Sequence, residues 1–491
     1  MVVLAACPGG NRSIGESCST LSDCASGLQC LDHTCVPACR RHADCGDGLE
    51  CVNGSCYASA GPLGSACDRE VDCAVGLACH LETTDIDSDG LLSATCGNDN
   101  AGGVLDTLCT VDTDCRNGTC ALGRCVDICA VDTDCPIGHV CTSIPRVTSL
   151  TAAAVPSFFG CLPDHGSITY ELPTASPQSD TWLPVPGNAR SVALVMTVAD
   201  ATQLVGAKLI HDPEGAQLYA YPGTLAEYYA NPLRHAPAPG ISVLTIPSSS
   251  AVPLRPGGYF MTLGSFRANG SPASDTPRAL VVAKLDTGTI LDVHFHFVDL
   301  AEHPCAAAFD GGILDATSAA TSPTFQNQFV ASLRSILARG GVAVGAITYD
   351  DVTGHPDLDG LEVRNLGALL ELSTQPGGIH VFLVRTLSPA GMLTAVGGTP
   401  GTPGIAGTAA SGIAVSLDGL CYRSWEEMAR VTAHATARHL GLFRNKEPDG
   451  ALDQIDDSDD QATNLMYYSE FGGTDLSDGQ REILMRSPVL R

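Results

Sequence analysis

The sequence of 491 residues predicts a multidomain fold, with disulfide-rich small-module repeats first, an all-β sandwich next and an α+β domain last. Three observations predict this order. Twenty of the 23 cysteines form groups of four near the N-terminus. The next segment has no cysteine and consists of short apolar runs between Pro/Gly turns, and the last alternates apolar strands with helical patterns. The predicted parts are 1–17 (export signal remnant and tether), 18–161 (cysteine-rich modules), 162–286 (β-sandwich) and 287–491 (α+β domain).

The first part carries the motif Leu4-Ala5-Ala6-Cys7, which is similar to the lipobox of bacterial lipoproteins. In that family the cysteine becomes the acylated N-terminus, so we expect lipidation of Cys7. The cysteine count agrees, because 23 is odd and 22 remain without Cys7. Only three residues precede the motif, too few for an export signal. Either the true start lies upstream or the similarity is accidental, and we favour the upstream start.

Cysteine density and charge define the predicted location. Regularly spaced cysteines are typical of an oxidising compartment, so we expect an exported protein at the outer membrane or cell surface, joined to the membrane only by a lipid at Cys7. The net charge of −28, with three lysines, argues against binding of nucleic acid or anionic lipid. No run of about 18 apolar residues predicts a membrane-spanning helix.

The cysteine-rich part repeats a unit of the form C-x5-C-x5-C-xn-C five times, which predicts an array of small modules. Asn53-Gly54 and Asn117-Gly118 are tight-turn signals, so we expect each module to be a hairpin held by two disulfides worth about 2–4 kcal/mol each. Metal binding is the competing prediction, which the absence of C-x-x-C pairs disfavours. Such an array serves as a stalk or a binding surface. The units are Cys18/Cys24/Cys30/Cys35, Cys39/Cys45/Cys51/Cys56, Cys67/Cys73/Cys79/Cys96, Cys109/Cys115/Cys120/Cys125 and Cys129/Cys135/Cys141/Cys161.

The third module contains an insertion with alternating carboxylates, Asp85, Asp87 and Asp89, followed by Gly90. This spacing resembles the start of a calcium-binding loop. Its twelfth position is Cys96 rather than glutamate, and three carboxylates alone do not complete a coordination sphere of about six to eight oxygens. The sequence therefore leaves two predictions open here, a calcium site or a solvated acidic loop.

The cysteine-free part has the short strands and Pro/Gly turns of a β-sandwich, and nothing in it points to chemistry. The α+β part has buried strands and a helix that opens at Ser322-Pro323 and ends at Gly340. Its two cysteines, Cys305 and Cys421, are expected to pair. His294 and His296 share one strand face; they could bind metal, but without a third partner we expect them on the sheet surface. The predicted strands are 167–172, 191–198, 241–246, 259–266 and 279–285, then 291–298, 342–349, 380–385 and 412–417.

The stretch from Ser424 to Tyr468 carries the outline of a metal site. It matches the spacing H-E-x-x-H-x-x-G-x-x-H, in which three histidines bind zinc and the glutamate is the general base. Ser424 and Glu427 form a capping-box pattern ahead of it. The matching residues are His434, Ala435, Arg438, Gly441 and Arg444, with Met466 and Tyr468 where a Met-turn and its tyrosine belong.

These residues resemble the metzincin zinc proteases, in particular their pappalysin-like branch, over about 200 residues. The resemblance makes His434 the one retained zinc ligand, puts Ala435 at the general-base position and puts Arg438 and Arg444 at the other ligand positions. A guanidinium about 4 Å from a dication repels it by roughly 8 kcal/mol at an effective dielectric of about 20. Loss of a general base typically costs about 10²–10⁴ in rate. We therefore expect no zinc and no intact catalytic group.

A buried arginine needs a carboxylate, so we expect an ion pair where the zinc would be. The predicted pairs join Arg438 or Arg444 to Asp453, Asp456 or Asp457. The resulting functional hypothesis is a catalytically inactive metzincin-like pseudoprotease that binds protein or peptide ligands. Two alternatives remain: an active zinc metalloprotease with a rearranged metal site, and a purely structural or adhesive surface protein.

Overall fold

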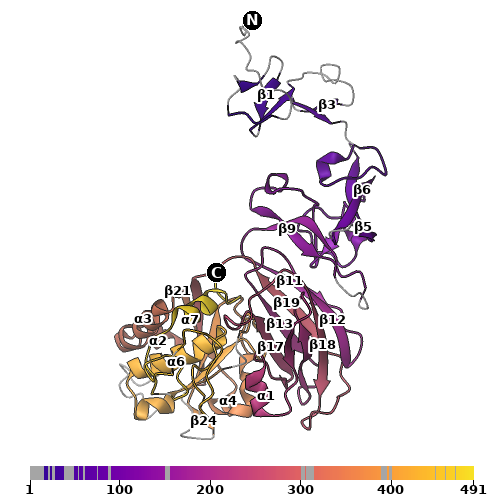
Figure 1. Cartoon of the computed structure of the whole chain (residues 1–491). Helices are drawn as coiled ribbons and strands as arrows, with labels where there is room; N and C mark the ends of the chain where they lie inside the picture. Colours follow the sequence, from indigo (N-terminus) through magenta and orange to yellow (C-terminus); the bar gives the residue numbers. More distant parts are fainter. Residues whose placement is uncertain are drawn as a thin grey trace, which may run out of the picture. The chain divides into compact units, whose positions relative to one another are not determined.

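The computed structural model describes residues 16–19, 23–24, 28–31, 33–37, 49–52, 55–58, 61–74, 76–86, 90–149, 155–299, 305, 314–388, 395–397, 401–447, 449–458, 460–469 and 471–491. The chain forms two compact units, Met1–Ile137 with Phe158–Leu162 and Gly138–Ser157 with Pro163–Arg491. Because the chain has two compact units and its strands outnumber its helices, the fold is multidomain and β-rich (Figure 1). Within the residues given above, no helix is long and apolar enough to cross a bilayer.

The first unit is a series of short antiparallel hairpins. Each hairpin sets the third cysteine of a module opposite the fourth, for example Cys30 opposite Cys35 and Cys79 opposite Cys96. The hairpins are β1 (Leu28–Leu31) with β2 (Thr34–Pro37), β3 (Leu49–Val52) with β4 (Ser55–Ala58), β5 (Leu77–Ile86) with β6 (Leu92–Asn98), and β7 (Cys120–Ala121) with β8 (Arg124–Cys125).

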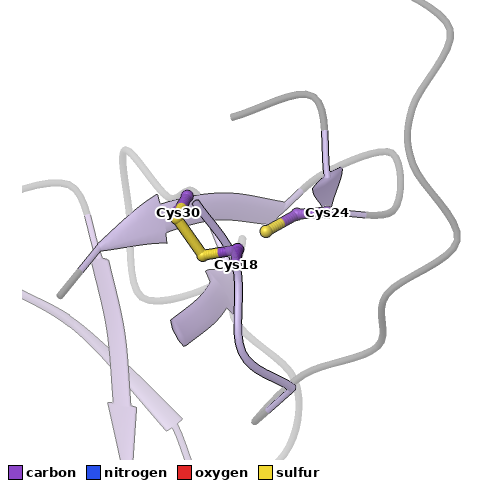
Figure 2. Close-up of side chains that lie close together, drawn as sticks. All are labelled: Cys18, Cys24 and Cys30. Atoms are coloured by element: carbon purple, nitrogen blue, oxygen red, sulfur yellow. A yellow bond between two sulfur atoms is a disulfide. The ribbon is translucent and has the colours of Figure 1, made fainter. Parts of the chain in front are cut away.

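In the first, third and fourth modules, disulfides join the first cysteine to the third and the second to the fourth. Figure 2 shows the Cys18–Cys30 bond with Cys24, which bonds to Cys35, beside it. The prediction of hairpins held by two disulfides is confirmed for these modules, and their sulfurs are not available as thiolate ligands. The other bonds are Cys67–Cys79, Cys73–Cys96, Cys109–Cys120, Cys115–Cys125 and Cys135–Cys161; Cys129 and Cys141 are also in disulfides.

An aspartate directly before the second cysteine organises the first, third, fourth and fifth modules. The Asp114 carboxylate accepts the backbone N–H groups of Thr110 and Val111 at 2.8 and 3.1 Å, and Asp134 makes the equivalent bonds. A carboxylate that accepts backbone N–H groups fixes a short turn, which explains why the Asp-Cys phrase recurs. The turns are η3 (Glu70–Asp72), η4 (Asp112–Asp114) and η5 (Asp132–Asp134).

One predicted hairpin turn is wrong. The chain between β7 and β8 turns at Leu122 and Gly123, whose φ values are 51° and 74°, and not at Asn117-Gly118. A turn with both central residues at positive φ matches the twist of the paired strands. Asn117 is buried instead, and its amide donates to the Val126 carbonyl at 2.7 Å.

The second unit begins with two antiparallel sheets, in which the chain is all β apart from the short helix α1 (Leu225–Ala230). Residues of β11 alternate between exposed and buried, as expected of a sheet with one covered face. Strand β14 of one sheet contacts β17 of the other. The first sheet has the order β11 (Ser167–Leu172), β19 (Arg278–Lys284), β13 (Ser191–Thr197), β17 (Ile241–Ile246); the second has β12 (Gln178–Val185), β18 (Gly257–Phe266), β14 (Leu204–His211), β15 (Gln217–Ala220), with β16 (Ala238–Pro239) beside β14.

The last part of the chain builds a five-stranded mixed sheet. Its four longer strands are parallel, and β23 and β26 are buried throughout, which is typical of strands covered on both faces. The strand β25 (Ala395–Gly397) adds an antiparallel edge. The order is β21 (Ala343–Val352), β20 (Ile290–Val298), β23 (Ile379–Val384), β26 (Gly412–Ser416) and β25, and a small second sheet pairs β22 (Gly360–Glu362) with β24 (Thr386–Ser388).

Helices cover both faces of the mixed sheet (Figure 1). One face packs Val293, Phe295 and Phe297 against the predicted apolar face of the helical segment from Phe325 to Arg339. The other packs Phe382 and its neighbours against short helices. The helices are α2 (Ala316–Thr321), a π-helical turn (Phe325–Val330) continued by α3 (Ala331–Arg339), α4 (Pro356–Asp359), α5 (Leu366–Leu370), α6 (Trp425–His439) and α7 (Asp478–Met485), with 3-10 turns at Val363–Asn365 and Leu417–Cys421. Earlier in the chain, β9 (His139–Pro145) and β10 (Ser157–Pro163) form a separate two-stranded sheet.

Candidate functional site

The helix that carries the motif, α6, begins as the sequence predicts. The Ser424 hydroxyl accepts the N–H of Glu427 at 3.2 Å, and the Glu427 carboxylate accepts the N–H of Ser424 at 2.8 Å. This capping box satisfies two backbone donors that a helix start leaves without partners.

The end of α6 also follows from its sequence. Gly441 has a φ of 124°, a conformation that side chains other than glycine rarely adopt. Its N–H donates to the Arg438 carbonyl at 3.0 Å, and the N–H of Leu442 donates to the Ala437 carbonyl at 3.1 Å. These are the two bonds of a Schellman motif, so the predicted stop at Gly441 is confirmed.

The structure brings the motif helix and the predicted Met-turn together. His434 on α6 lies 2.7 Å from the Leu465 carbonyl through Nδ1. The next residue, Met466, is completely buried in the core that also contains Ala433 and Ala437. The turn itself is closed by Asn464, whose side-chain oxygen accepts the Met466 N–H at 2.8 Å.

The contact with Leu465 fixes the state of His434. A carbonyl only accepts, so Nδ1 carries the hydrogen and Nε2 has a lone pair. Burial, and then the charges of Arg438 and Arg444, lower the pKa of His434 to about 4, although the bond to Leu465 opposes this. The imidazole is therefore neutral near neutral pH, in the tautomer in which histidines bind metals.

Arg438 lies one turn after His434 and has no ion pair with any described residue. Its Nη1 is buried without a hydrogen-bond partner. Burial, followed by the charge of Arg444, lowers the pKa of Arg438. A buried donor without a partner typically costs about 1–3 kcal/mol, so this guanidinium lowers the free energy of unfolding.

Arg444 does have a carboxylate partner, but not a predicted one. Its Nη1 lies 3.0 Å from the Glu447 carboxylate, three residues along the chain. The predicted partners are wrong for both arginines, because those aspartates form hydrogen bonds with other groups near them. Asp457 accepts the N–H of Gly479 at the start of α7, at 3.0 and 3.2 Å. Asp453 accepts the N–H of Ile455, and burial raises its pKa to about 6; Asp456 makes its contact to Ser250 through its backbone N–H.

The residues at the motif do not fit zinc. One neutral histidine, His434, is present, while the other two ligand positions carry guanidinium groups that repel a cation. Ala435 at the general-base position has a methyl side chain and so offers no carboxylate, and it packs in the core at 4% exposure. Tyr468 is 40% exposed, and its ring is tilted by 42° against that of Tyr467, with the ring centroids 4.6 Å apart.

A pocket of about 370 Å³ opens beside the motif. Arg438, Gly441 and Phe443 line it on the α6 side, and Arg234 and Thr245 line it from the two-sheet part of the same unit. Sequence reasoning missed Arg234, which lies far from the motif along the chain and carries no local signal. The pocket therefore holds two arginines from distant segments.

The prediction for the two strand histidines is wrong. His294 and His296 are 6% and 3% exposed, and His380 of the neighbouring strand joins them, with ring centroids about 5 Å from each (5.0 and 5.1 Å). His380 donates through Nε2 to the Gln375 carbonyl at 3.1 Å, so its Nδ1 accepts from His296 Nε2 at 2.8 Å. Parallel pairing sets His294 opposite His380. Burial lowers the pKa of His296 to about 4 and that of His380 to about 3.

Other predicted sites have different outcomes. Cys305 and Cys421 form the expected disulfide, with Cα atoms 4.8 Å apart. The predicted lipidation site Cys7, the turn Asn53-Gly54 and the calcium-loop carboxylates Asp87 and Asp89 lie outside the described residues, as does the side chain of Asp85. Calcium binding and lipidation therefore stay predictions.

Comparison of the sequence with protein-family models and with characterised proteins finds no match.

Proposed function

We propose that this chain is an exported, surface-tethered lipoprotein whose C-terminal part is a metzincin-like pseudoprotease that binds protein or peptide ligands. One observation carries the proposal. Arg438, at the position of the second zinc ligand, lines a pocket of about 370 Å³, and its buried Nη1 has no hydrogen-bond partner. A pocket of this volume lies within the usual range of ligand sites.

The disulfides of the first unit support export, because such bonds persist in oxidising compartments. The capped helix, the glycine stop and the buried Met466 support a metzincin-like frame. Ala435 and the two arginines support loss of hydrolysis, because neither a general base nor a ligand triad is present.

One specific observation favours the alternative of a working metalloprotease. His434 carries its hydrogen on Nδ1 and leaves Nε2 unprotonated, as a zinc ligand does. This alternative requires further ligands from elsewhere in the chain, and it predicts chelator-sensitive cleavage.

The test uses the full chain purified from an oxidising compartment. We expect no chelator-sensitive cleavage of an unfolded protein substrate with or without added zinc, and binding of members of a peptide library. The variant Ala236→Trp, an exposed residue that lines the pocket, should abolish peptide binding, while Ala216→Trp, an exposed residue away from the pocket, should not. Peptide binding that survives Ala236→Trp would place the ligand elsewhere, and zinc-dependent cleavage would establish the alternative.

A further inference from the structure

We propose that Arg234 and Arg438 together form a carboxylate subsite in this pocket, which accepts the end of a peptide or a small organic acid. The inference rests on the proposed peptide-binding function and gives it a ligand chemistry.

Arg234 is almost completely buried, at 5% exposure, yet most of its donors are unused. Its Nη2 donates to the Leu452 carbonyl, while Nε and Nη1 are buried without partners. The guanidinium carbon lies 5.1 Å from the ring centre of Tyr229 and 5.8 Å from that of Phe443. These rings hold the cation in place by cation–π attraction, so the free donors have a fixed position.

Arg438 supplies a second cation to the same wall. Its Nη1 is also buried without a partner, and no described carboxylate forms an ion pair with either Arg234 or Arg438. Glu447 is bound to Arg444, and Asp453, whose pKa burial raises to about 6, is ionised at neutral pH but forms no direct ion pair with Arg234, so two carboxylates face three guanidinium groups. The pocket therefore has an excess of positive charge in a chain whose net charge is −28.

Two further polar side chains of the wall, His235 and Thr245, already have hydrogen-bond partners. The His235 ring donates through Nδ1 to the Val243 carbonyl at 3.3 Å and accepts the Ala207 N–H at 3.2 Å through Nε2. The Thr245 hydroxyl donates to the Gly401 carbonyl at 2.9 Å. The buried charged donors of this wall that lack partners are thus guanidinium N–H groups, while the Tyr228 and Ser248 hydroxyls also line the pocket.

Guanidinium donors select an anion, and their planar fork matches a carboxylate. The space next to them is small and partly apolar, with Pro237, Val243 and Phe443 in its wall. About 370 Å³ is near the lower end of the usual range of ligand pockets, which suits one terminal residue or one small acid rather than a long peptide. A carboxylate on a small apolar body is therefore the ligand class.

Calorimetric titration of the full chain tests this with four probes: acetyl-alanyl-alanine, its carboxamide, propionate and inorganic phosphate. We expect the peptide acid to bind about tenfold or more tightly than the amide, because the amide cannot form charge-assisted bonds. If acid and amide bind equally, the carboxylate subsite is refuted while peptide binding stands. If only propionate binds, the subsite stands and the proposed peptide function fails. Phosphate binding more tightly than both acids would overturn the ligand class, and no binding by any probe would overturn the subsite.

Two variants separate the subsite from general effects on folding. Arg438→Met should remove the preference for acid over amide, whereas Arg444→Met, whose side chain is paired with Glu447 and does not line the pocket, should keep it. Thermal melts of both variants verify that each is folded. A preference for the acid that survives in folded Arg438→Met would refute the role of Arg438.

Discussion

His434 donates its Nδ1 hydrogen to the Leu465 carbonyl across 2.7 Å, which joins the motif helix to the turn that contains the buried Met466. This bond is a direct side-chain hydrogen bond between the two halves of the predicted metal site. It connects residues 31 positions apart in the chain and so contributes to tertiary structure rather than to the helix alone.

The first prediction concerns that bond. His434→Leu should lower the free energy of unfolding by about 1–3 kcal/mol, because the Leu465 carbonyl loses its donor in a buried place. His165→Leu, at an exposed position, should leave it nearly unchanged. Urea unfolding of both variants measures the difference; equal stabilities would show that the link contributes nothing.

The two arginines of the motif should respond in opposite directions. Arg438→Met should raise the free energy of unfolding by about 1 kcal/mol or more, because it removes a buried donor without a partner. Arg444→Met should lower it by less than about 1 kcal/mol, since the Glu447 pair is one-third exposed on the arginine side (33%) and is screened by solvent. Thermal and urea melts test this pair of variants. A loss of stability in Arg438→Met would mean that its guanidinium has a partner.

The chain should lose stability on mild acidification. Five histidines have folded pKa values of about 3 to 4, because burial disfavours the charged imidazole, so the unfolded chain binds their protons first as pH falls below about 6.5. Each histidine lowers the free energy of unfolding by about 1.4 kcal/mol per pH unit as the pH falls from about 6.5 to its folded pKa. Asp453, whose pKa is raised, has the opposite effect. The five are His235, His296, His380, His434 and His439.

His439→Leu tests the acid dependence at one position. His439 is fully buried and neither ring nitrogen has a partner, so leucine should fold and should reduce the slope of stability against pH by about 1.4 kcal/mol per unit between pH 6 and 4. His165→Asn, at an exposed histidine, should not reduce it. Urea melts at several pH values give the slopes, and an unchanged slope in His439→Leu would refute the explanation by burial.

The Cys305–Cys421 disulfide should be worth about 4 kcal/mol, because it closes a loop of 116 residues in the unfolded chain. The double variant Cys305→Ser with Cys421→Ser should show this loss in urea unfolding. Removal of one first-unit pair, Cys109→Ser with Cys120→Ser, should leave the unfolding of the second unit unchanged. Mass spectrometry should find no free thiol on Cys305 or Cys421 in the natural protein.

Local signals predicted much of the fold. The strands at 167–172 and 241–246 match the structure at both ends, and the Ser424 cap and Gly441 stop define α6, because period-two patterns and capping residues act over a few positions. The strands β12 and β14 were missed. Pro184 interrupts the apolar pattern of β12 and Gly206 that of β14, and both residues weaken a strand signal.

The site was less predictable, because its partners come from distant segments. Arg444 forms its ion pair with Glu447, only three residues away, and not with one of the more remote aspartates. Arg234 lines the pocket because the two antiparallel sheets lie against the part with the mixed sheet. His380 lies beside His294 because of the register in which their strands pair. Neither contact has a signature within its own stretch of sequence.

The account predicts that the metal frame survives and only ligands are missing. The double variant Arg438→His with Arg444→His should therefore bind zinc in the micromolar range or better, using the unprotonated Nε2 of His434 as the third ligand. Adding His434→Ala to this variant should abolish the binding. A double variant that folds but binds no zinc would show that the geometry of the frame is not that of a metal site.

Metal analysis of the natural protein, purified from an oxidising compartment and dialysed against micromolar zinc, tests the central claim most directly. The account predicts only trace zinc, unchanged by His434→Ala, because Arg438 and Arg444 repel a cation beside His434. One zinc per chain that is lost in His434→Ala would contradict it and would make this chain a metalloprotein.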